Sequence, residues 1–136
     1  MNKENQIKYI SKQLFEEGNI EIIDSFFTEN YLAHDGEKKH SGHKFVKNFI
    51  KKIQSAINNL KIVKIEILSQ TDNTLTWQRT FRGIHRFDMQ GIPASNRNVK
   101  WNEMVVTRFE GEKIAEEWVV STLAFQLMIK HKVLKS

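Results

Sequence analysis

The sequence predicts an α+β fold in which N-terminal helices pack on a strongly curved, mainly antiparallel sheet and form a cone with an internal pocket. Apolar residues recur at helical spacing before residue 60 and alternate with polar residues after it, so a helical half precedes a sheet half. The two longest predicted strands, residues 74–86 and 98–110, hold about a dozen residues each, against a usual ~5–6. Strands of that length accumulate twist and curl, and the open end of a curled sheet is a place for a ligand.

The length and composition of the chain exclude several classes of function. We expect the 136 residues to form a single domain, residues 1–136, because the chain has no length for a second core. It has no cysteine, which excludes disulfides, thiolate metal ligands and a thiol nucleophile. The polar N-terminal segment and the lack of ~18 consecutive apolar residues predict a cytoplasmic protein that does not contact a membrane. The net charge of +5 comes from scattered lysines without a nucleic-acid-binding motif, so no nucleic acid is expected as a partner.

Three helical segments are expected in the first half. The first ends at Gly18 and carries apolar residues at helical spacing, namely Ile7, Ile10, Leu14 and Phe15. The second is short, and its apolar residues are Ile20, Ile22, Ile23, Phe26 and Phe27. A loop over residues 30–40 follows, with a turn at Asp35-Gly36.

The third helix is the longest of the three. Ser41 is its predicted N-cap, and Asn58-Asn59 is predicted to end it. Its apolar stripe consists of Phe45, Val46, Phe49, Ile50, Ile53 and Ile57. This stripe indicates that one side of the helix packs on the sheet.

Strands are predicted for most of the second half. Alternation begins at residues 63–67, and a turn at residues 69–73 leads into the strand 74–86. A loop with Gly91 and Pro93 precedes the strand 98–110. Gly111 then marks a tight hairpin into a strand over residues 113–122. The short apolar segment 123–129 is expected to be a helix or a strand.

Alternation places charged groups among bulky apolar ones in these strands. Trp77, Arg79, Phe81 and His85 share one face of the strand 74–86, and Trp101 shares a face with Glu103 in the next. A charged group on a covered face needs a partner or a cavity, so Arg79 is expected either to pair with Glu103 or to line the pocket. With Trp118 of the last strand, the tryptophans are predicted to point inward, as pocket walls or as core residues.

The motifs in the sequence leave proton transfer and electrostatic stabilisation as the expected chemistry of the pocket. His34, His40 and His43 lie close in sequence, but without a carboxylate pair at metal-ligand spacing they predict no metal site. His40 and His43 are expected at the surface, and His34 in the pocket. No nucleophile elbow, phosphate loop or dinucleotide motif occurs, so no cofactor is expected.

An ordered set of short motifs extends over nearly the whole chain. These are Phe26-Phe27-Thr28-Glu29-Asn30-Tyr31 leading to His34, Gly83-Ile84-His85 followed by Gly91-Ile92-Pro93, and Arg108-Phe109-Glu110-Gly111-Glu112-Lys113-Ile114 running into Glu116-Glu117-Trp118. By this order and spacing the sequence resembles the SnoaL-like ester cyclase (polyketide cyclase-like) group of the nuclear transport factor 2-like superfamily. The resemblance implies an α+β cone, a pocket between sheet and helices, and a homodimer formed through the sheet.

The resemblance also implies two functional hypotheses. Relatives include cyclases that close a ring by aldol chemistry through acid/base catalysis without a cofactor. On this hypothesis the protein acts as a cyclase or isomerase on a small, partly apolar carbonyl compound. His85 or His34 transfers the proton, Arg79 stabilises negative charge, and the ligand pocket comprises Trp77, Phe81, Trp101, Glu103, Trp118 and Thr122. Thr122 stands where the cyclases have an acid/base aspartate, which favours the second hypothesis: a non-catalytic ligand-binding or structural dimer domain.

Overall fold

A computed structural model of the protein describes residues 2–133. It consists of helices on one six-stranded sheet, in the order β2-β1-β6-β5-β4-β3. The helical elements are α1 (Lys3–Ser11), a π-helical turn η1 (Lys12–Glu16), a 3-10 turn η2 (Ile20–Ile22), α2 (Ile23–Phe26), α3 (His43–Ala56) and α4 (Leu123–Val133). The strands are β1 (Phe27–Asp35), β2 (Lys38–Ser41), β3 (Ile57–Gln70), β4 (Thr74–His85), β5 (Asn98–Glu110) and β6 (Lys113–Ser121).

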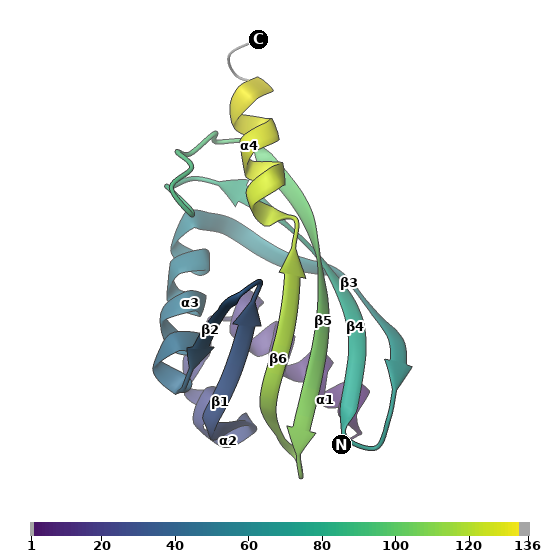
Figure 1. The fold of residues 1–136 in the computed structure, drawn as a ribbon. Helices are drawn as coiled ribbons and strands as arrows, with labels where there is room; N and C mark the ends of the chain where they lie inside the picture. Colours follow the sequence, from purple (N-terminus) through teal and green to yellow (C-terminus); the bar gives the residue numbers. More distant parts are fainter. Residues whose placement is uncertain (1, 134–136) are drawn as a thin grey trace.

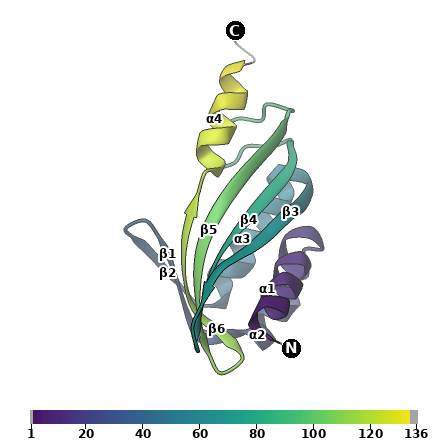
Figure 2. The same ribbon diagram turned by 90° about the vertical axis from the view of Figure 1, so that its right-hand side faces the viewer.

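The predicted fold class is confirmed. The sheet is curved and open, and its neighbouring strands are antiparallel except for the parallel pair β1 and β6. The helix α1 lies across one face of the sheet, α3 lies beside the hairpin of β1 and β2, and α4 projects beyond the end of β6 (Figure 1, Figure 2). We call the face toward α1 the inner face and the opposite one the outer face. The strand β5 has its predicted bounds, and β4 and β6 each end one residue early.

The predicted loop over residues 30–40 is wrong. The chain instead forms a hairpin of β1 and β2, in which Leu32 is paired with Ser41 and Asp35 with Lys38. The strand β1 is hard to recognise in the sequence because most of its residues are polar and only Tyr31 and Ala33 are buried after Phe27. The predicted turn at Asp35-Gly36 is confirmed, with Gly36 at a φ of 62°.

The predicted boundaries of the long helix are also wrong. Ser41 ends β2, and Gly42, at a φ of 86°, occupies the N-cap of α3 without a side-chain hydrogen bond. The helix ends at Ala56, and Ile57 already pairs with His85 as the first residue of β3. A bulge between Asn58 and the residues that follow lets the strand start directly after the helix. The last segment, left open between helix and strand, is the helix α4.

The buried core lies between the inner face and the N-terminal helices. Its largest fully buried side chains include Trp77, Trp101 and Phe81, and the Phe81 ring stacks on Trp101 at 5.0 Å between centroids. At Gly83 an added Cβ would lie 2.3 Å from the Ile57 side chain, so β3 and β4 approach closely there. None of the helices within residues 2–133 is long and apolar enough to cross a membrane.

Candidate functional site

A cavity of about 470 Å³ lies between the inner face of the sheet and the helices. Its size falls in the ~300–1,000 Å³ range of small-molecule sites. Most of its walls are apolar: Ile7, Ile10, Leu14 and Phe15 from α1 and η1, Phe45, Val46, Phe49 and Ile50 from α3, and Ala33, Trp77 and Ile114 from the sheet. The polar side chains deep in the cavity belong to two clusters.

The first polar cluster is a buried ion pair. Arg79 Nη2 and Nε lie 2.6 and 2.7 Å from Glu103 Oε1, across neighbouring positions of β4 and β5. The second carboxylate oxygen accepts hydrogen bonds from Ser121 Oγ at 2.7 Å and Trp101 Nε1 at 3.3 Å. The guanidinium also lies 4.8 Å from the centre of the Phe15 ring, where its charge attracts the ring electrons. Both predicted alternatives for Arg79 therefore hold, because it pairs with Glu103 and lines the cavity.

The second polar cluster is centred on Glu117, which sequence reasoning missed. Tyr31 donates from its hydroxyl to Glu117 Oε1 at 2.9 Å, and Thr107 donates to Oε2 at 2.5 Å. Thr107 in turn accepts a hydrogen bond from Trp77 Nε1 at 3.0 Å. The carboxyl group of Glu117 thus lines the cavity at the end of a chain of hydrogen bonds from three strands.

The surroundings of Glu117 raise the affinity of its carboxylate for a proton. Burial raises the pKa of the Glu117 carboxyl above 4.5, while the hydrogen bond from Thr107 and the charge of Arg79 oppose the shift. Burial and the neighbouring Glu117 also raise the pKa of the Tyr31 hydroxyl well above 10.0, so this hydroxyl stays a donor. Carboxyls whose pKa is raised by burial serve as acids and bases in active sites.

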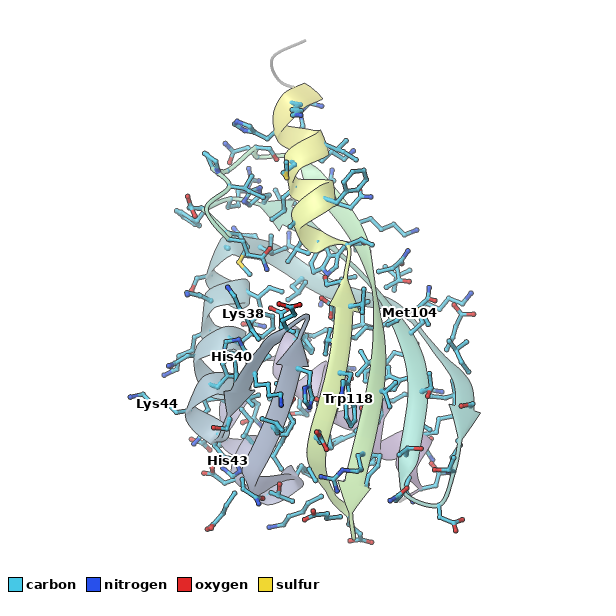
Figure 3. All side chains as sticks on the ribbon, in the orientation of Figure 1. Lys38, His40, His43, Lys44, Met104 and Trp118 are labelled. Atoms are coloured by element: carbon cyan, nitrogen blue, oxygen red, sulfur yellow. The ribbon has the colours of Figure 1, made fainter. Side chains whose placement is uncertain are left out.

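The mouth of the cavity is formed by the β1–β2 hairpin, α3 and the loop that follows β4. His40 stacks on Phe45 with 4.3 Å between ring centroids, and both side chains line the opening, as does Lys52. Asp35 and Asp88 contribute carboxylates at the same end. His40 and His43 mark this side of the molecule in Figure 3.

The structure brings together only part of the predicted site. Trp77, Arg79 and Glu103 line the cavity, whereas Phe81 and Trp101 are buried without lining it. Thr122 is exposed, and its hydroxyl donates to the carbonyl of Asn102 at 3.2 Å instead of reaching the cavity.

The two predicted catalytic histidines lie elsewhere. His85 is fully buried outside the cavity lining, neither of its ring nitrogens has a hydrogen-bond partner in the described chain, and burial lowers its pKa. His34 borders the cavity, but its ring stacks on Trp118 at 4.8 Å and its Nε2 lies 2.6 Å from Glu116 Oε2. Neither imidazole is therefore placed as the cavity base.

The prediction that Trp118 points inward is wrong. It is 39% exposed on the outer face, where it is labelled in Figure 3 beside Met104. A bulge between Arg108 and Phe109 in the pairing of β5 with β6 leaves Ala115 as an extra residue. Beyond it the alternation is reversed, so Glu117 rather than Trp118 turns inward. In the sequence, the two consecutive apolar residues Ile114 and Ala115 are the signal that could have indicated the bulge, and both are buried.

No group of three potential metal ligands occurs among residues 2–133. The two histidines next to the long helix have other contacts. His43 Nδ1 lies 2.9 Å from Asp24 Oδ1, and its Nε2 lies 2.8 Å from the carbonyl oxygen of Thr28. The His40 ring stacks on Phe45.

Comparisons with known proteins were made at the level of sequence and of structure. Residues 6–127 match the family model described as SnoaL-like polyketide cyclase. No curated protein matches the sequence.

Solved structures share the fold at low sequence identity. A candidate polyketide cyclase from Acidithiobacillus ferrooxidans is 17% identical with a TM-score of 0.78, over 93% of this chain and 92% of that one. TsrD from Streptomyces laurentii is 19% identical with a TM-score of 0.77, over 93% of this chain and 97% of its own. A SnoaL-like polyketide cyclase from Agrobacterium tumefaciens is 21% identical with a TM-score of 0.74, over 95% and 99% of the two chains.

Proposed function

Because the chain belongs to the SnoaL-like polyketide cyclase family, we propose that it binds a small, partly apolar carbonyl compound in its cavity and moves a proton on it. The observation that carries this proposal is the carboxyl of Glu117, which lines an apolar cavity and has a pKa raised by burial. A base of this kind removes a proton beside a carbonyl group without a cofactor. Glu117 replaces the two predicted histidines in this role because its carboxyl lines the cavity, whereas His85 does not line it and the Nε2 of His34 is engaged by Glu116.

Each step is assigned to a side chain of the cavity. The carboxylate of Glu117 takes the proton from the carbon next to the carbonyl, and the electron pair of the C–H bond moves to the carbonyl oxygen. The two bonds from Arg79 to Glu103 use Nε and Nη2, which leaves Nη1 as a donor for the resulting enolate. In ring closure the enolate carbon attacks a second carbonyl carbon, the C=O π electrons move to that oxygen, and the oxygen takes the proton back from Glu117. In isomerisation Glu117 returns the proton to another carbon.

Two neighbouring glutamates provide a matched test. Wild-type protein, Glu117→Gln and Glu116→Gln are each incubated with small aryl 1,3-diketones in D₂O, and exchange of the hydrogen between the carbonyls is followed by NMR. Glu117→Gln should lose about 10²–10⁴-fold of the catalysed exchange rate, the usual contribution of a general base. Glu116 lies on the outer face in contact with His34 and Arg108, so its variant should keep the wild-type rate. Equal rates in all three proteins would remove Glu117 from the mechanism.

A second candidate function is binding without catalysis. It is supported by the two polar clusters, where every carboxylate oxygen of Glu103 and Glu117 already accepts a hydrogen bond from the protein. On this reading both carboxylates only shape the cavity. Saturable quenching of the fluorescence of Trp77 by a diketone that undergoes no catalysed exchange would favour it.

The homodimer stays a prediction. Three exposed apolar side chains on the outer face support a dimer, because a second copy of the chain would cover them: Met104, Trp118 and Val120. Sedimentation of wild-type protein and of Val120→Glu tests it, since a charge on an apolar contact should dissociate a dimer.

A further inference from the structure

A second cleft of about 450 Å³ lies away from the cavity. It is lined by Ile84, Arg86, Asn96, Arg97, Asn98 and Lys130, and none of these residues lines the cavity. Among the residues that the structure describes, its polar lining therefore consists of three cations and two amides, with no carboxylate. We call this site the cationic cleft.

Backbone hydrogen bonds hold the two arginines in place. The amide of Arg86 donates to the carbonyl of Ala56 at 2.9 Å, which ties it to the end of α3. The amide of Asn96 donates to the carbonyl of His85 at 2.8 Å, and the amide of His85 donates to the carbonyl of Arg97 at 3.1 Å. Arg86 and Arg97 are thereby fixed on adjacent segments rather than carried on a free loop.

The third cation comes from the C-terminal helix. Leu123 and Leu127 of α4 are 2% and 0% exposed, so one side of this helix is packed firmly on the protein. Lys130 lies three residues after Leu127 and therefore on the same side of the helix. The helix thus carries its ammonium group to the cleft.

A row of three further cations crosses the sheet near the cleft. Arg82 of β4 is paired in register with Lys61 of β3 and with Lys100 of β5, and all three are exposed. We call these residues the cation row. Like charges directly opposite each other destabilise a sheet. Arg82 and Arg86 are four residues apart in the chain and so lie at most about 14 Å apart, which makes the row and the cleft one positive region.

None of these six cations is paired with a carboxylate in the part of the chain that the structure describes, 2–133. Other cations are paired, as Arg79 is with Glu103 and Arg108 with Glu116 and Glu110. The six cations share one region of the molecule, and a bound anion would relieve their mutual repulsion.

We propose that the cationic cleft binds a small molecule that carries a phosphate or pyrophosphate group. The planar guanidinium groups of Arg86 and Arg97 match the geometry of phosphate oxygens and can each donate two hydrogen bonds. Lys130 adds charge, and the amides of Asn96 and Asn98 add neutral donors. The cation row attracts the anion toward the cleft over a longer range. This site is independent of the function proposed for the cavity.

Isothermal titration tests the proposal with two probes, inorganic pyrophosphate and adenosine 5′-monophosphate, which separate a free phosphate ligand from an organic phosphate. Arg86→Gln/Arg97→Gln should weaken binding at least about tenfold, since hydrogen bonds to charged groups are the strong ones. Lys44→Gln/Lys51→Gln removes the same charge from exposed positions of α3 and should change the affinity less than about twofold. Arg86→Lys/Arg97→Lys keeps the charge and the fold but should still weaken binding, because lysine lacks the planar fork.

Three results would overturn the proposal. One is equal weakening by the cleft and α3 variants, which would mean attraction by net charge alone. Another is no saturable binding of either probe below about 10 mM. The last is tighter binding of a single-stranded RNA oligonucleotide that Lys61→Gln/Lys100→Gln weakens as much as the cleft variant does, which would indicate a nucleic-acid surface instead.

Discussion

Glu116 and Glu117 are adjacent in sequence and have opposite environments. Glu117 points into the cavity, where burial raises its pKa. Glu116 lies on the outer face, where the hydrogen bond from His34 and then that from Arg108 lower its pKa. One residue step in a strand therefore separates a carboxyl that favours its proton from one that favours its charge.

The two glutamates should affect stability with opposite sign as pH changes. A raised pKa means that the folded state holds its proton more tightly, so Glu117 costs stability progressively as pH rises above 4.5. A lowered pKa means that Glu116 contributes stability above pH 4.5, which is lost as pH falls through its folded pKa. As pH rises from 4 to 7, the free energy of unfolding of Glu117→Gln should rise relative to wild type. As pH rises toward 4.5 from below, that of Glu116→Gln should fall relative to wild type. Urea unfolding at each pH measures both, and parallel curves for the two variants would contradict the assignments.

At the residue scale, alternation within a regular strand predicted much of the site. It placed Trp77, Arg79 and Glu103 on the inner face because β4 and β5 pair without a register shift. The same rule placed Trp118 on the wrong face because simple alternation assumes a strand without a bulge, and β6 has one. It therefore also missed Glu117, whose inward direction depends on that one extra residue.

Among the elements, strong periodicity was the reliable signal. The strand β5 and the helix α3 each carry a regular apolar pattern, and both were predicted, β5 with its bounds. The strand β1 was missed because it is buried through partners distant in sequence, β6 among them, rather than through its own composition. Local patterns contain no information about such a partner.

The cation row makes the part of the sheet formed by β3, β4 and β5 less stable than it could be. Arg82→Gln removes the middle charge and so relieves repulsion with Lys61 and Lys100 together. The midpoint of thermal unfolding should rise by on the order of 1–3 °C. Lys44→Gln, a loss of charge at an exposed helix position, should leave it nearly unchanged. The difference should disappear in 1 M salt, where exposed charges are screened, and its persistence there would argue against repulsion as the cause.

On the scale of the whole molecule, the interior is not fully packed, and this can be measured. Ala33 lines the cavity, so Ala33→Leu places its added carbons in empty space and should fold with nearly unchanged stability. Ala56 is also buried but does not line the cavity, and Ala56→Leu should lower the free energy of unfolding by about 1–3 kcal/mol through overpacking.

The same pair of variants tests whether the cavity takes up ligands. The fluorescent probe 1-anilinonaphthalene-8-sulfonate should bind Ala33→Leu more weakly than wild type, since the added side chain occupies its space. If Ala33→Leu were as destabilised as Ala56→Leu, the interior would be filled in solution.

The parallel pairing of β1 with β6 has a consequence for how the protein is made. The hydrogen bond from Tyr31 to Glu117 joins residues 86 positions apart in the chain. A nascent polypeptide that has left the ribosome only as far as β5 has the β1–β2 hairpin and the antiparallel strands β3, β4 and β5, but lacks β6, the strand that joins the two. During synthesis the side of the cavity that holds Tyr31 and Glu117 therefore forms only after β6 has emerged, and until then Tyr31 and the unpaired edge of β5 are open to chaperones.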